Sequence, residues 1–201
     1  MSRTKNLDTI SKVILVIALP FFYSVSYSLF DFPQAFEEPL IETFQISAVE
    51  VTSLDAINAS FTIPVDFLMV KILQKYKLKQ TAVFFALISA LGTFLTHLAI
   101  PWTNYKILVL ARLFYGIGLE SLYVVSGVGV EKWFKVSEII LVNGLARVEL
   151  KLVNTLMVFL MPYLYVAFDS LTAPMLALEL MSLVLVFNSI LFYIIETRYE
   201  G

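Results

Sequence analysis

The sequence predicts an all-α protein that crosses a membrane several times. Hydrophobic residues make up 59% of the 201 residues, and charged residues make up only 15%. The mean hydropathy is +0.85, which is more than the interior of a water-soluble domain of this length could bury. The apolar residues also fall into stretches of roughly 20 or more, the length at which a helix crosses about 30 Å of hydrocarbon.

Six apolar stretches satisfy this length. They cover residues 13–36, 49–72, 82–101, 107–130, 139–166 and 174–195. Because no segment between them is long enough to fold separately, residues 1–201 are predicted to form one six-helix transmembrane domain. The first stretch follows Arg3 and Lys5, as in a signal peptide, but it is too long for one and lacks a small-x-small cleavage site. We therefore expect it to be a retained helix.

Basic residues at the ends of the spans predict the orientation of the bundle. Ten of the fourteen basic residues fall on one side, namely Arg3, Lys5, Lys12, Lys71, Lys75, Lys77, Lys79, Lys132, Lys135 and Arg198. The opposite side carries Lys106 and the acidic segment "EEPLIETF". The positive-inside rule therefore places both termini in the cytoplasm.

Composition argues against several other classes of function. The net charge is −2, so there is no basic excess to bind nucleic acid. The chain has no cysteine and a single histidine, His97, and we expect neither a metal centre nor a cofactor. It also contains no phosphate-binding loop and no nucleophile elbow, so an enzyme is not expected.

Polar side chains recur at steps of three and four residues on four of the predicted spans. These are Ser24, Tyr27, Ser28 and Asp31 on the first; Asp55, Asn58, Thr62 and Asp66 on the second; Arg112, Gly116, Glu120 and Tyr123 on the fourth; and Asn143, Arg147, Lys151 and Asn154 on the fifth. A charge in hydrocarbon costs at least about 2.5–3.5 kcal/mol, so these groups need water or partners. The four stripes predict a shared polar cavity, with the third and sixth spans facing mostly lipid.

Depth along the helices predicts three layers of opposite charge in this cavity. At 1.5 Å per residue, Glu120 lies about 15 Å and Lys151 about 18 Å from the cytoplasmic ends of their spans, near the midplane. Asp31 shares the outer third with Arg112, and Asp66 shares the inner third with Arg147.

Such charges have two interpretations, as structural ion pairs between helices or as contacts to a solute. We expect the structural role for the outer and inner pairs. For the midplane pair we expect a zwitterionic solute, with its ammonium group on Glu120 and its carboxylate on Lys151. The candidate substrate-binding residues are Glu120, Lys151, Arg112, Arg147, Asp31 and Tyr123.

The segment "RLFYGIG" on the fourth span places Arg112, Gly116 and Gly118 in an Arg-x-x-x-Gly-x-Gly pattern. This pattern recurs on the fourth helix of major facilitator superfamily transporters. Together with the six spans and the four polar stripes, it makes the chain resemble the N-terminal six-helix half of that superfamily. The resemblance implies transport of a small solute across the bilayer.

A narrower resemblance is to the lysosomal dipeptide uniporter group of that superfamily. It rests on "FDFPQAF" at the end of the first span and on "ESLYVV" followed by "KWFKVSEIILVNGL" across the fourth–fifth turn. It implies a lysosomal or other endomembrane location and a dipeptide-like substrate that binds Glu120 through its amino end and the fifth-helix base through its carboxylate. In the relatives that base is typically Arg, whereas here it is Lys151. The superfamily's second–third loop usually carries Gly and Asp, where this chain has Val70 and Gln74.

The resemblance covers nearly the whole chain but only half of a full transporter. Because alternating access rocks one half against the other, transport would need a homodimer, a separate C-terminal half, or a continuation of the chain. The alternative is a six-helix membrane protein that does not transport, either a truncated product or a paralogue that binds a partner.

Overall fold

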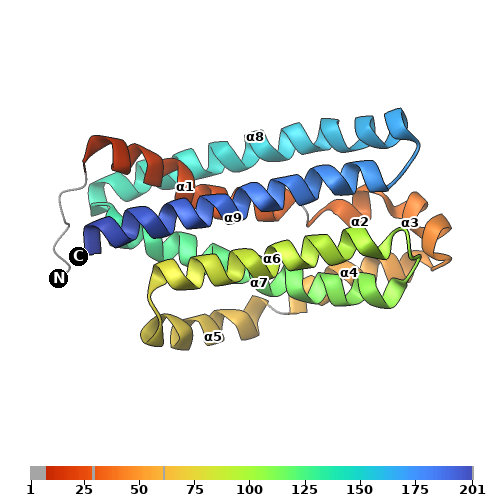
Figure 1. Cartoon of the computed structure of the whole chain (residues 1–201), viewed down its shortest axis with the longest axis horizontal. Helices are drawn as coiled ribbons and strands as arrows, with labels where there is room; N and C mark the ends of the chain where they lie inside the picture. Colours follow the sequence, from red (N-terminus) through yellow and green to blue (C-terminus); the bar gives the residue numbers. More distant parts are fainter. Residues whose placement is uncertain (1–7, 29, 61, 201) are drawn as a thin grey trace.

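The structure is a computed structural model that describes residues 8–28, 30–60 and 62–200 of the chain. Within these residues every regular element is a helix. The helices are α1 (Thr9–Ser28), α2 (Phe32–Ala35), α3 (Glu37–Phe44), α4 (Ala48–Ser60), α5 (Thr62–Lys75), α6 (Leu78–Ala99), α7 (Tyr105–Trp133), α8 (Val136–Phe168) and α9 (Thr172–Glu200). The long helices run roughly along one axis, and the short α2 and α3 lie together at one end (Figure 1).

Five helical segments of the described chain are long and apolar enough to cross a membrane. They are Ala48–Lys75, Leu78–Ala99, Tyr105–Trp133, Val136–Phe168 and Thr172–Tyr199. These segments contain or overlap the second to sixth predicted spans, so the prediction of a polytopic helical membrane protein is confirmed. The apolar helix at the N-terminal end, Thr9–Phe22, is shorter. The count of six and the cytoplasmic position of the termini stay predictions, and Arg3 and Lys5 lie outside the described residues.

The first helix differs from its predicted range of 13–36. It begins at Thr9 and ends at Ser28, and a new helix, α2, begins at Phe32 after the turn that holds Asp31. Pro33 explains the change, because it has no N–H to donate to the carbonyl four residues earlier. Proline is well tolerated in the first turn of a helix, which is where Pro33 lies in α2.

Helix α7 is central, since it packs against α1, α4, α5 and α6, and its closest neighbour is α6. Two glycines permit this approach. A β-carbon at Gly92 would lie 2.5 Å from the backbone nitrogen of Tyr115, and one at Gly118 would lie 2.7 Å from the backbone nitrogen of Ser89. The backbones of α6 and α7 therefore touch at both points, as small residues allow in membrane helices.

Gly118→Ala is expected to lower the free energy of unfolding by about 1–2 kcal/mol. The added methyl group meets backbone and forces α6 and α7 apart, which outweighs the gain in helix propensity. Gly127→Ala on the same helix is the control, because no atom lies within 4 Å of its added carbon. Thermal unfolding in detergent should show a lower Tm for the first variant and an equal or higher Tm for the second. Equal losses would contradict the close packing.

Side chains at one end of the bundle connect the start of α1 to the end of α9. The hydroxyl of Tyr199 donates to Asp8 at 2.5 Å and lies 3.2 Å from the hydroxyl of Ser11. The hydrogen bonds from Ser11 and Tyr199 hold the pKa of the Asp8 carboxyl below its usual value. Helix α1 is also joined to α8 by the ion pair of Lys12 with Glu138. The chain therefore enters and leaves the bundle at the same end (Figure 1).

Candidate functional site

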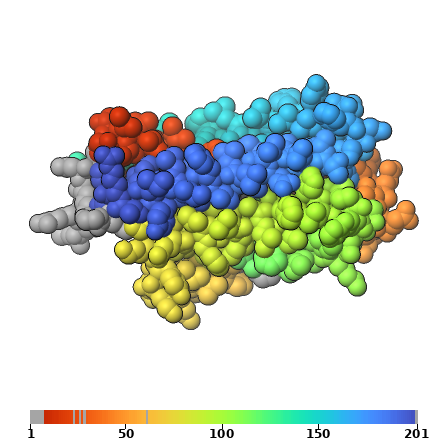
Figure 2. All heavy atoms as spheres, viewed as in Figure 1, coloured from red at the N-terminus to blue at the C-terminus, as the bar shows by residue number. Residues whose placement is uncertain are grey.

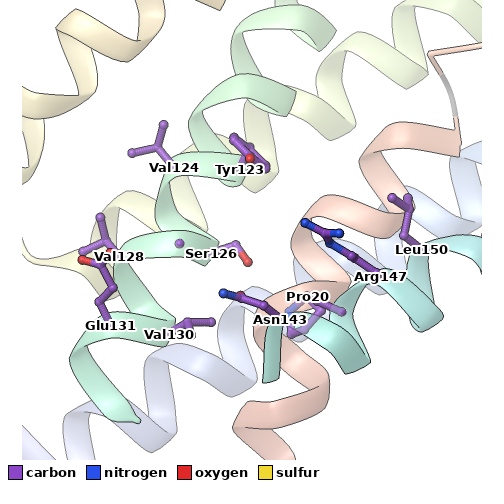
Figure 3. A pocket seen from close by; sticks show the side chains of 12 residues that line it. Pro20, Tyr123, Val124, Ser126, Val128, Val130, Glu131, Asn143, Arg147 and Leu150 are labelled. Atoms are coloured by element: carbon purple, nitrogen blue, oxygen red, sulfur yellow. The ribbon is translucent and has the colours of Figure 1, made fainter. Parts of the chain in front are cut away.

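A cavity opens between α7 and α8 because these neighbouring helices make few contacts with each other. Helix α8 packs chiefly on α1 and α9, whereas α7 packs on α6. The cavity measures 660 Å³ and is lined by α7, by the first half of α8 and by Pro20 of α1. Figure 3 shows Arg147 and Asn143 of α8 pointing across it toward the α7 residues Tyr123 and Ser126.

Local sequence features set where the two helices begin. The side chain of Asn104 accepts hydrogen bonds from the backbone N–H groups of Lys106 and Ile107 and so caps α7. At the start of α8, Glu138 accepts from the backbone N–H of Lys135 at 3.0 Å. Further along α7 and α8, Tyr123 and Arg147 line the cavity from facing sides (Figure 3).

Glu120 lines a second, smaller hollow of 220 Å³ beside this cavity. The hollow lies between α1, α4, α5 and α7, and its polar lining groups are Tyr27, Thr62, Glu120 and Tyr123. The hydroxyl of Thr62 donates to Glu120 Oε1 at 3.0 Å, which holds the carboxylate in place. Glu120 is half-buried, so it can still meet a ligand that enters the hollow.

Lys151 lines a third hollow, of 370 Å³, on α8. Arg147 lines this hollow as well as the 660 Å³ cavity, and both side chains are exposed. Tyr123 in turn lines both the 660 Å³ cavity and the hollow of Glu120. Tyr123 and Arg147 therefore each line two of the three hollows, and the three hollows together are called the polar groove below. An acid, Glu120, lies at one end of the groove, and two bases lie toward the other.

The structure pairs the charges differently from the predicted layers. No ion pair joins Glu120 to Lys151, or Asp66 to Arg147, although all four residues belong to the described chain. Other ion pairs lie outside the groove and join different pairs of helices, namely α1 with α8, α6 with α9, and α7 with α9. Among the described residues, such pairs include Lys12 with Glu138, His97 with Glu179, and Lys132 with Glu196. Glu120, Arg147 and Lys151 therefore form no ion pair with one another.

Two of the predicted site residues lie away from the groove. Arg112 is 1% exposed, and its guanidinium lies over the rings of Phe32 at 5.8 Å and Tyr115 at 5.7 Å. This position indicates a structural role, in which cation–π contacts help to hold the arginine between α2 and α7. Asp31 is exposed at the start of α2, and neither residue lines any of the three hollows.

The groove also contains polar residues that were not among the candidates. Asn143 and Thr62 belong to the predicted stripes of the fifth and second spans, so the helical spacing could have found them. Glu131 lies one residue beyond the predicted end of the fourth span, where no periodic signal marks it. Only the structure shows that Glu131 lies on a helix that lines the groove, because α7 extends to Trp133.

A bundle of apolar helices with charged side chains facing hollows between them is typical of solute carriers. The sequence comparison agrees, since the profile of the Major Facilitator Superfamily matches residues 12–200. The chain belongs to this superfamily and is a transporter-like, multi-pass integral membrane protein. A search of curated proteins and one of solved structures find no match.

Proposed function

We propose that the polar groove binds a small zwitterionic solute, such as a dipeptide, for transport across the membrane. In this proposal Glu120 receives the ammonium group, while Lys151 and the neighbouring Arg147 receive the carboxylate. Tyr123 lines the passage between them. The resemblance to the lysosomal dipeptide uniporters supports the substrate class and suggests a lysosomal or related membrane as the site of action.

One observation carries the proposal: the acid and the two bases line hollows that share Tyr123 and Arg147, and they form no ion pairs among themselves. Unpaired charges at membrane depth are expensive, so a site that keeps them separate favours a ligand that brings the opposite charges. A dipeptide has an ammonium group and a carboxylate several bonds apart. Opposite charges in neighbouring hollows match this separation better than an acid and a base in direct contact would.

Transport by this mechanism requires a second six-helix bundle, because access alternates by rocking one bundle against the other. We propose that another copy of the chain, a separate C-terminal half or a continuation of the chain supplies it. Arg147 and Lys151 are exposed, so a second bundle that covers them would close the groove from that side.

The test is the binding of a ligand series to the purified chain in detergent by calorimetry. An unmodified neutral dipeptide is expected to bind, whereas its N-acetylated and C-amidated forms should each bind at least about tenfold more weakly. Each modification removes one charge that the groove would meet, worth about 1.5–3 kcal/mol. Equal binding of all three ligands would contradict the proposal. No binding of any of them would favour a membrane protein that does not transport.

A further inference from the structure

Three exposed lysines lie at the turn between α5 and α6. Lys71 and Lys75 are one helical turn apart on α5, and so lie on one face, and Lys77 directly precedes α6. None of the three takes part in an ion pair within the described chain. The sequence explains this in part, because no Asp or Glu occurs between Asp66 and Glu120.

Three acids at the same end of the bundle are engaged with other residues. The α5–α6 turn lies at the end of the bundle where α7 and α9 finish and α8 begins (Figure 1). At that end Glu138 pairs with Lys12, Glu196 pairs with Lys132, and Asp8 accepts from Tyr199. The three lysines are called the lysine patch below, and none of them forms an ion pair with an acid of the described chain.

The surroundings of the lysine patch point to a ligand in the plane of the membrane. The patch joins two candidate spans, Ala48–Lys75 and Leu78–Ala99, so it lies where hydrocarbon meets water. Just before it, α5 exposes the apolar side chains of Phe67, at 73%, and Val70, at 58%. Tyr76 is half exposed, and the Lys75 ammonium lies 5.5 Å from the centre of its ring. Figure 2 shows α5 protruding from the body of the bundle, open to such a ligand.

We propose that the lysine patch binds the headgroup of an anionic phospholipid. The ammonium groups would meet the phosphate, and the acyl chains would lie along the exposed apolar side chains of α5. Lysines at a membrane surface attract anionic lipid with about 1 kcal/mol each, equivalent to roughly a fivefold change in affinity per lysine. A soluble anionic macromolecule would leave the apolar side chains of α5 without a partner.

Native mass spectrometry of the purified chain, titrated with phosphatidylglycerol or phosphatidylcholine, tests the proposal. Phosphatidylglycerol is expected to bind more tightly. Lys75→Gln should weaken it about fivefold, and the triple variant Lys71→Gln, Lys75→Gln, Lys77→Gln should weaken it at least tenfold. The matched control is Lys106→Gln, which changes an exposed lysine in the first turn of α7, at the opposite end of that helix, and should leave binding unchanged.

Three results would overturn the proposal. The first is equal affinity for both lipids, and the second is wild-type affinity for phosphatidylglycerol in the triple variant. The third is displacement of the lipid by an equal concentration of inorganic phosphate, which would identify a site for free phosphate instead. Surface substitutions of this kind usually change stability by less than about 0.5 kcal/mol, and an unchanged Tm verifies that the variants are folded.

Discussion

Replacing Glu120 with Gln is expected to weaken the binding of an unmodified dipeptide by about 10- to 100-fold. The loss corresponds to one hydrogen bond to a charged group, about 1.5–3 kcal/mol. Gln keeps the shape of the side chain and can still accept the hydrogen bond from Thr62. The change therefore removes the charge while the hollow is retained. Calorimetric titration of the variant gives the affinity directly.

The ligand series separates a contact with the ammonium group from a general loss of the site. The N-acetylated dipeptide has no ammonium group, so it should bind the wild type and Glu120→Gln with similar affinity. The matched control is Glu42→Gln, which changes an exposed acid on α3 and should affect neither ligand. If both ligands were lost in parallel, or if Glu120→Gln lowered the amount of folded protein, Glu120 would have a structural role.

Replacing Lys132 with Ala is expected to lower the free energy of unfolding by about 3 kcal/mol. Lys132 forms an ion pair with Glu196, whose side chain is 0% exposed. Removal of the base leaves a carboxylate buried between α7 and α9 without this partner, and breaking a buried pair from one side typically costs about 3–5 kcal/mol. Unfolding in mixed detergent micelles with an increasing fraction of a denaturing detergent, followed by circular dichroism, measures the change in the free energy of unfolding.

Two further variants distinguish a buried charge from a simple loss of contacts. The double variant Lys132→Ala, Glu196→Gln removes the charge as well, and it should recover a large part of the lost stability. Lys12→Ala breaks the ion pair with Glu138, whose side chains are 37% and 32% exposed, and should cost less than about 1 kcal/mol. Equal losses in Lys132→Ala and Lys12→Ala would contradict the importance of burial.

Hydropathy predicted the class of the protein well because a bilayer imposes a length on each apolar helix. Four of the candidate spans, from α6 to α9, overlap their predicted ranges, and the helices then extend into polar residues at their ends. The same reasoning failed at the end of the first span. There the apolar residues continue to Phe36, but a separate short helix begins at Phe32, with Pro33 in its first turn.

The height of a residue in the membrane was not sufficient to predict which charges form pairs. Counting residues along α7 and α8 gives the height of Glu120 and Lys151 in the membrane, but it contains no information on the distance between the helices. That distance depends on packing. Gly92 and Gly118 bring α6 against α7, whereas α8 packs on α1 and α9 and leaves the 660 Å³ cavity beside α7.

Composition and periodicity alone were sufficient to define a helical membrane protein with polar stripes, because both depend only on residue types and on the spacing of 3.6 residues per turn. The same stripes contain Glu120, Tyr123, Arg147 and Lys151, whose role in binding a solute stays a prediction. The assignment of charges to partners required the tertiary structure. Arg112 proved to be buried against Phe32 and Tyr115, and the buried Glu196 proved to pair with Lys132. These contacts join residues on different helices, and side-chain packing between helices, which no spacing along one helix encodes, determines which of them form.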